Sequence, residues 1–299
     1  MVAVGAKLGA FPYASELRRE LGIRNRLYAQ QRRLPSRESY GEPPVVCYLP
    51  AEDGRSHGNF LPATYRAIRQ NTSWRKRLEK VHSQARHTLP REEWRWRELD
   101  SSNSSDALLM NIFCFPGTLK QQRVFDWLGV DASEVPRFGV KARVPLTGGG
   151  ADRTEVDMCV GRLLVEAKLT ESDFQTAEAR FVERYRDFAE VFDRRSLPRE
   201  GNCYASYQLI RNVLAAWAMG CSFCLMADIW RPDLKEAWYA VMQAVQIVDL
   251  RLRCKMITWQ ELAQVLPRKL GRFLEEKYGI VPEGKGTKQT DALCEPVLL

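Results

Sequence analysis

The sequence predicts an α/β protein in which helices flank a central mixed sheet. Three observations lead to this prediction. Residues 153–169 alternate apolar and polar side chains on both sides of a Gly-Arg pair, which is the pattern of a β-hairpin. Residues 222–228 form a short apolar run typical of a buried strand. Apolar residues recur at helical spacing before and after these strands, so we expect helices to cover the sheet.

Size and composition are those of a globular protein. The chain has 299 residues, 45% of them hydrophobic, and no apolar run reaches the length of a membrane span. Its eight cysteines lack the spacing of a disulfide framework, and no secretory signal pattern opens the sequence. We therefore expect no membrane partner and a reducing, cytoplasmic compartment.

Positive charge is concentrated in the first third of the chain. Residues 1–100 contain 19 Lys and Arg against 11 Asp and Glu, whereas residues 101–299 contain 26 of each. A basic segment beside a neutral domain suggests a polyanionic partner, and solubility alone explains the charge equally well. We divide the chain into a basic, largely helical N-terminal extension (1–100), a core (101–250) and a C-terminal segment of helices and tail (251–299).

The N-terminal extension shows little sign of a core of its own. Residues 1–45 mix Arg pairs with Pro and Ser, and a helix over 16–31 would have no convincing apolar face. We therefore expect a weakly ordered basic arm. Residues 59–81 interleave apolar and basic side chains and predict one or two basic helices broken near residues 71–73. Such a surface suits a phosphate backbone, and a solvated helix face is an equally good interpretation.

The predicted core begins with a buried helix over 101–115, capped by Ser104 or Ser105. Another amphipathic helix covers 119–128, and alternation over 136–145 predicts a strand that precedes the hairpin. After the hairpin, Ser172 to Gln175 fits a capping box and predicts a helix that continues to about residue 197. The remaining predicted elements are helices over 204–219 and 234–248 on either side of the strand 222–228, a helix from the Thr258 capping box to 265, and a helix over 268–278.

The hairpin carries acids and a lysine where an apolar ribbon would not require them. If Gly161 and Arg162 form a two-residue type II′ turn, Asp157 faces Glu166 and Glu155 faces Lys168. These four side chains would share one side of the ribbon. The apolar side chains from Val156 to Ala167 would share the other, facing a core. Two opposed carboxylates repel each other unless a cation lies between them, and Mg²⁺ is the cation that such oxygen ligands favour.

These residues resemble a known family pattern. Asp157 followed by Glu166-Ala167-Lys168, within the order helix, strand, strand, strand, helix, strand, resembles the PD-(D/E)XK nuclease superfamily with its restriction-endonuclease-like fold. The longer stretches 104–113, 154–157 and 164–168 are similar to bacterial proteins described as restriction endonucleases, and the resemblance covers about residues 100–250. Val156 stands where the superfamily has its eponymous proline, a position that carries no chemistry.

The resemblance implies a role for each matching residue. Asp157 and Glu166 would coordinate Mg²⁺, or Mn²⁺ in its place, and the Ala167 carbonyl would complete the set of ligands. Lys168 would position or help to deprotonate the attacking water and stabilise charge on the phosphate. Asp106 is the candidate for an acid contributed by the first core helix, and Gln208 for a glutamine contributed by the helix after the motif.

Several alternatives stay open. Glu155 either binds a second metal ion or forms an ion pair with Lys168, and we favour the ion pair. For the whole protein, a metal-dependent DNA endonuclease competes with a nucleic-acid-binding protein that keeps the fold without cleaving. The intact Asp157, Glu166 and Lys168 favour the enzyme. RNA as a substrate and a homodimeric assembly are both compatible with the sequence.

Overall fold

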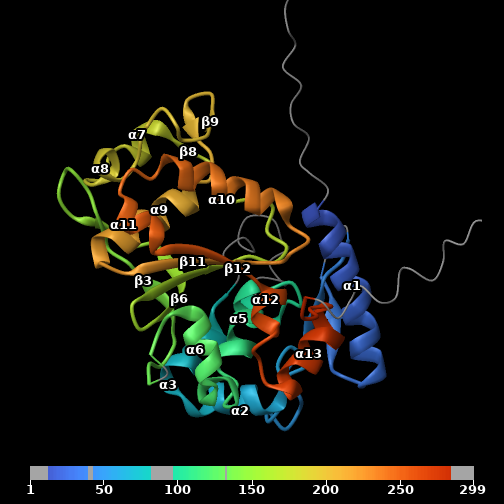
Figure 1. Ribbon diagram of the computed structural model, residues 1–299. Coiled ribbons are helices and arrows are strands. Elements are labelled where there is room, and N and C mark those ends of the chain that lie inside the picture. The colour runs from blue at the N-terminus through green and yellow to red at the C-terminus, as the bar shows by residue number, and fades with distance from the viewer. Residues whose placement is uncertain (1–12, 40–42, 82–96, 132, 284–299) are drawn as a thin grey trace, which may run out of the picture.

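A five-stranded mixed sheet lies at the centre of the molecule (Figure 1). The computed structural model describes residues 13–39, 43–81, 97–131 and 133–283. The strand order is β12-β11-β7-β6-β3; β3, β6 and β7 are antiparallel neighbours, whereas β7, β11 and β12 run parallel. Their bounds are Arg137–Lys141 for β3, Glu155–Val160 for β6, Leu163–Ala167 for β7, Ser222–Ala227 for β11 and Cys254–Thr258 for β12. The predicted mixed sheet flanked by helices is confirmed.

Both faces of the sheet are covered, as β11 shows by strict alternation. Phe223 and Leu225 pack into one hydrophobic cluster, whereas Cys224 and Met226 pack into another on the opposite face. The first, here the α9-side cluster, contains side chains of four helices drawn above the sheet in Figure 1. They are α7 (Ala179–Val182), α8 (Phe188–Val191), α9 (Tyr207–Met219) and α10 (Pro232–Ala244), with α11 (Val248–Leu252) beside them.

The opposite cluster, here the α5-side cluster, is formed with helices drawn below the sheet in Figure 1. It takes side chains from both ends of the chain, because Leu17 and Leu21 share it with Leu270 and Leu274. The core therefore draws on all three parts of the predicted division. Its helices are α1 (Tyr13–Gln31), α5 (Ser105–Phe113), α6 (Gln122–Leu128), α12 (Trp259–Ala263) and α13 (Arg268–Tyr278).

Helix α1 corrects the prediction of a weakly ordered arm for the part of that segment that the structure describes. The helix packs against α13 and buries Leu17, Leu21, Asn25 and Ala29. The sequence shows no convincing apolar face for this helix because its buried face includes Asn25. This asparagine is satisfied by the backbone carbonyls of Leu21 and Lys277 and by the Lys277 amine, 2.6 Å from its Oδ1. A polar contact across 252 residues is invisible to a pattern of hydrophobic spacing.

The basic segment 59–81 is helical and broken at Asn71, as predicted. Helix α2 (Pro62–Gln70) is followed by α3 (Thr72–Arg75) and by the 3₁₀ helix η1 (Lys76–Glu79). The Asn71 side chain caps α3 by accepting the N–H groups of Ser73 and Trp74. Apolar residues of this segment, including Tyr65, Ile68 and Trp74, pack against Ala107 and Met110 of α5.

The predicted helix over 172–197 is wrong. Short elements replace it, and Gln175 has a φ of 61°, which a helix does not accommodate. The carbonyls of Phe174 and Gln175 accept the first N–H groups of α9 instead, from Gln208 and Tyr207. Strand β12 was not predicted, because it lies at the sheet edge and most of its side chains are only partly buried. The capping box of Thr258 and Glu261, which begins α12, is confirmed.

The remaining elements are short. The predicted strand 136–145 is divided, because Arg143 adopts a φ of 51° and Val144–Pro145 pairs separately as β4. Within the described residues, no helix is long and apolar enough to cross a membrane. The other strands are β1 (Ser36–Glu38), β2 (Val46–Tyr48), β5 (Ala151–Asp152), β8 (Ala177–Glu178), β9 (Arg199–Glu200) and β10 (Cys203–Tyr204), and the other 3₁₀ helices are η3 (Glu98–Asp100) and η4 (Thr118–Lys120).

Candidate active site

The candidate site lies where β6 and β7 separate. Next to the turn, the predicted register is confirmed: Val160 pairs with Leu163 and Met158 with Val165. Gly161 has a φ of 55°, as the first central position of a type II′ turn requires. The ladder between β6 and β7 ends at the pair of Met158 with Val165. Beyond it, Asp157 accepts the backbone N–H of Ala167 through its carboxylate, at 2.8 Å, instead of forming the expected cross-strand pair with Glu166.

Strand β6 changes its orientation at Asp157. Val156 packs into the α9-side cluster, whereas Met158 and Val160 pack into the α5-side cluster. The expectation that these three side chains share a face is therefore wrong. The change coincides with Gly139 on β3, whose φ is 63° and which stands opposite Asp157 between two regular pairs of the ladder. A local distortion of both strands thus carries Asp157 out of the regular pleat.

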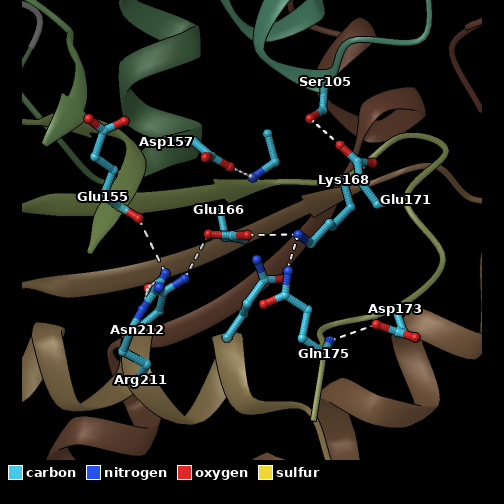
Figure 2. Close-up of polar contacts among 12 residues, drawn as sticks. Ser105, Glu155, Asp157, Glu166, Lys168, Glu171, Asp173, Gln175, Arg211 and Asn212 are labelled. Atoms are coloured by element: carbon cyan, nitrogen blue, oxygen red, sulfur yellow. Dashed lines mark hydrogen bonds and ion pairs between the residues drawn. The ribbon is translucent and has the colours of Figure 1, made fainter. Parts of the chain in front are cut away.

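Glu166 and Lys168 form a buried ion pair that faces α9 (Figure 2). The Lys168 Nζ lies 2.8 Å from Glu166 Oε1 and donates to Gln208 Oε1 at 2.8 Å. Asn212 donates to the other carboxylate oxygen of Glu166 at 2.7 Å. One helix therefore orients both side chains of the Glu-x-Lys motif.

The expected pair of Glu155 with Lys168 is wrong. Lys168 lies beyond the end of β7, and its backbone N–H bonds to Met226 of β11, which carries its side chain towards α9. The Glu155 carboxylate lies 3.1 Å from the Arg77 guanidinium and 3.6 Å from the Lys80 amine. The four charged side chains of the hairpin therefore do not share one side of the ribbon.

Three residues at one face of α9 hold the two strands. Gln208, Arg211 and Asn212 have the spacing i, i+3 and i+4, so they project from the same side of the helix. Arg211 donates to the Glu155 carbonyl and to the Asn212 side chain, at 3.2 and 3.1 Å. The sequence predicted a role for Gln208 alone. A signal for Asn212 was present, because it is a polar residue at a helical position whose neighbours Leu209 and Val213 are core.

The surroundings of Asp157 and Lys168 shift the pKa values of both side chains. Burial raises the pKa of Asp157 well above its ordinary value, and the charges of Glu166 and Asp106 raise it further. Burial lowers the pKa of Lys168, but the charges of Glu166, Glu171 and Asp157 outweigh it and raise that pKa above its ordinary value. These shifts favour the charged amine of Lys168 and, without a bound cation, the protonated carboxyl of Asp157.

Asp106 of α5 is buried and belongs to a second group of charges next to Asp157. It pairs with Arg77 and lies 3.9 Å from Lys80. Burial raises the pKa of Asp106 to about 6; Arg77 opposes that shift, and Glu98 adds to it. The residue predicted as an additional metal ligand therefore already has a cationic partner.

The loop after Lys168 is held by Arg231, whose side chain is fully buried. Its guanidinium donates to the carbonyls of Leu169, Glu171 and Ser172 at 3.2, 2.7 and 3.1 Å. Asp233 accepts the remaining donors of Arg231. Nothing in the hydrophobic spacing points to these contacts, which join Arg231 to residues about 60 positions earlier, so this role was missed.

The donor atoms fit a Mg²⁺ ion held by few protein ligands. Within the described ranges, no three His, Cys, Asp or Glu side chains are grouped as a metal site. Asp157 and Glu166 supply two carboxylates, and the Ala167 carbonyl belongs to the same strand end. Mg²⁺ is usually held by one or two carboxylates and keeps several waters, so this set suits it. Burial, Glu166 and Asp106 raise the pKa of Asp157, and a cation bound beside it would oppose that shift.

Comparison with known proteins adds one family match. Residues 36–279 match the family described as Restriction Endonuclease associating with ARP. No curated protein matches the chain. No solved structure matches it either. The matched range contains the whole sheet and every residue of the candidate site.

Proposed function

The chain belongs to the family of restriction endonucleases associating with ARP, and from this we propose that it hydrolyses phosphodiester bonds of DNA with a divalent metal ion. We further propose a PD-(D/E)XK site in which Asp157, Glu166 and the Ala167 carbonyl hold Mg²⁺, with Mn²⁺ as an alternative ion. The single observation that carries the proposal is the buried Asp157 carboxylate beside Glu166 and Lys168, with a pKa raised by burial and by Glu166.

Lys168 acts as a fixed positive charge. Its raised pKa argues against a role as the base that deprotonates water, because a base must lose its own proton first. Held by Glu166 and Gln208, the amine can instead donate to a phosphate oxygen and stabilise the negative charge that develops there. When bound, Mg²⁺ supplies Lewis-acid stabilisation and lowers the pKa of a coordinated water.

Gln208 and Asn212 are positioning residues for this reaction. Gln208 accepts a hydrogen bond from the Lys168 amine and so holds it in place. Asn212 donates a hydrogen bond to the carboxylate of Glu166, the proposed metal ligand, and so fixes its orientation. Such outer contacts commonly change metal affinity or activity by 10- to 100-fold when removed. We propose an endonuclease rather than an exonuclease, a choice that the word endonuclease in the family description supports.

The test is cleavage of supercoiled, linear and single-stranded DNA, and of RNA, with Mg²⁺, with Mn²⁺ and with EDTA. We expect metal-dependent nicking or linearisation of supercoiled DNA. Asp157→Asn and Lys168→Met should each lower the rate at least about 100-fold, because each removes charge stabilisation made in the transition state. Asp249→Asn is the matched control, since Asp249 is exposed and its one ion-pair partner among the described residues is Arg253.

Two outcomes would contradict the proposal. One is the absence of cleavage of any substrate with either metal, which would favour a nucleic-acid-binding protein that keeps the fold. The other is cleavage by Asp157→Asn at the rate of the parent protein. Cleavage of RNA alone would keep the site and change the substrate.

A further inference from the structure

A guanidinium occupies the space between α5 and β6 beside the proposed metal site. Arg77 of η1 donates a hydrogen bond from one terminal nitrogen to the Asp106 carboxylate. Its other terminal nitrogen donates to Glu155 Oε2 at 3.1 Å. The side chains of Arg77 and Asp106 are only 11% and 7% exposed. Lys80 lies 2.9 Å from Glu98 and completes the group. These acids are therefore neutralised by residues of the chain itself.

The backbone of β3 makes room for this arginine. A Cβ atom at Gly139 would lie 2.4 Å from a terminal nitrogen of Arg77 and 3.1 Å from Glu155 Oε2. Real Cβ atoms essentially never come so close to another heavy atom, so a side chain at position 139 would have to displace the Arg77 guanidinium. Gly139 also has a φ of 63°, which favours glycine. Arg77 thus occupies a shaped space, which a solvated surface arginine would not require.

The arginine group and the proposed metal site share one electrostatic environment. The Arg77 guanidinium lies against Gly139, which stands opposite Asp157 on the neighbouring strand, and its partner Glu155 is two residues from Asp157 on β6. Enzymes that use two metal ions place the second ion a few ångströms from the first and hold it with acids of this kind. Here Asp106 and Glu155, the acids available for a second ion, both bind Arg77.

We propose that Arg77 takes the place of a second metal ion, so that the site binds one divalent cation and Arg77 provides the second positive charge permanently. The inference rests on the proposed function, because it requires the first ion at Asp157 and Glu166. Arg77 is a positioning residue here: it holds Asp106 and Glu155 and withholds them from solvent cations. A built-in cation makes cleavage depend on the occupancy of one ion rather than two.

The test is the number of Mn²⁺ ions bound by metal-free protein at pH 8, measured by calorimetry and by the Mn²⁺ electron paramagnetic resonance signal. We expect one ion for the parent protein and two for Arg77→Met, which keeps most of the buried stem and removes the cation that lies closest to both acids, whereas Lys80 stays 3.6 Å from Glu155 and 3.9 Å from Asp106. Arg77→Lys should bind one ion, because it keeps the positive charge. In the double variant Arg77→Met with Glu155→Gln, the second ion should bind at least about tenfold more weakly, because it loses a ligand.

Different results separate this inference from the proposed function. Two ions on the parent protein, or one ion on a folded Arg77→Met variant, would overturn the role of Arg77 and leave the site at Asp157 intact. No ion on the parent would contradict the proposed metal site and the inference with it. Because the parent count alone can refute the inference, it does not depend on the stability of any variant.

Discussion

Asp157 holds its charge in an unfavourable place, and this has a consequence for stability. An acid whose pKa is raised in the folded state binds its proton more tightly there than in the unfolded chain. Its ionisation therefore lowers the free energy of unfolding as the pH rises through the raised pKa. A bound divalent cation reverses that effect, since it binds the ionised form. Metal-free protein should lose stability towards neutral pH, and metal should restore it.

The Asp157→Asn variant tests whether the charge of Asp157 destabilises the metal-free protein. Asparagine keeps an oxygen that can accept the Ala167 N–H and removes the repulsion with Glu166. We therefore expect the metal-free variant to be more stable than the parent at pH 7.5, with a smaller difference at pH 4, where Asp157 is protonated in the folded chain and only partly ionised in the unfolded chain. Thermal melts with EDTA or Mg²⁺ measure it, and the variant should also lack the rise in Tm caused by Mg²⁺. A variant less stable than the parent at pH 7.5 in EDTA would show that Asp157 is not under electrostatic strain.

At the scale of elements, the loop between β7 and β8 depends on Arg231. Its guanidinium binds three backbone carbonyls of that loop and is anchored by Asp233 at the start of α10. The loop follows Lys168 directly, so its anchor also helps to place the amine. The first residues of α10 and the arginine before them therefore determine the path of the chain after the Glu-x-Lys motif.

Arg231→Met should remove this anchor. Three backbone acceptors, of which the Leu169 carbonyl is the buried one, and the Asp233 carboxylate would lose their donor. At about 1 kcal/mol each, we expect a loss on the order of 4 kcal/mol in the free energy of unfolding. Urea unfolding measures the loss, and limited proteolysis should show faster cleavage within residues 169–176. Lys235→Met, an exposed position in the same helix, is the control and should change stability by less than about 0.5 kcal/mol. Equal stability of the two variants would exclude the anchor.

The elements that could be predicted from the sequence are those whose signals are local. The turn at Gly161 predicted the first pairs of the hairpin, and Thr258 predicted the start of α12, because each acts on residues within a few positions. The site was only partly predictable. Arg77 reaches Glu155 across 78 positions, and Asn212 reaches Glu166 across 46. Contacts of that range follow from packing, which hydrophobic periodicity does not encode.

At the scale of the whole molecule, the basic charge of α2 and α13 lines two pockets that share Pro62. Their volumes are about 540 and 510 Å³. Arg66, Lys269 and Arg272 line them, are exposed, and form no ion pair with any acid that the structure describes. These helices lie at the end of the molecule opposite α7 and α8 in Figure 1. Unpaired cations in hollows are suited to phosphates of a long nucleic acid.

Replacing Arg66, Lys269 and Arg272 together by glutamine tests whether they bind DNA. If each binds a phosphate, the slope of log affinity against log salt should fall by about 2 to 3, because each phosphate that is no longer neutralised lowers it by about 0.9. Fluorescence anisotropy with duplex DNA over a range of salt measures the slope. Arg180→Gln with Arg186→Gln, at the opposite end, is the control with exposed cations. An unchanged slope in the triple variant would assign its charges to solubility.

Point variants are preferable to a deletion of residues 1–100. Such a deletion would remove Leu17, Leu21 and Ile68 from hydrophobic clusters of the core.

Gly139, which makes room for Arg77, lies in β3, one of the two edge strands of the sheet. Such an edge can template a strand from another molecule and so start aggregation. The left-handed kink at Gly139 interrupts β3 midway, and exposed Arg137 and Lys141 mark its two ends. A short, kinked and charged edge is a poor template. Two copies of this protein should therefore not extend one sheet into the next through β3.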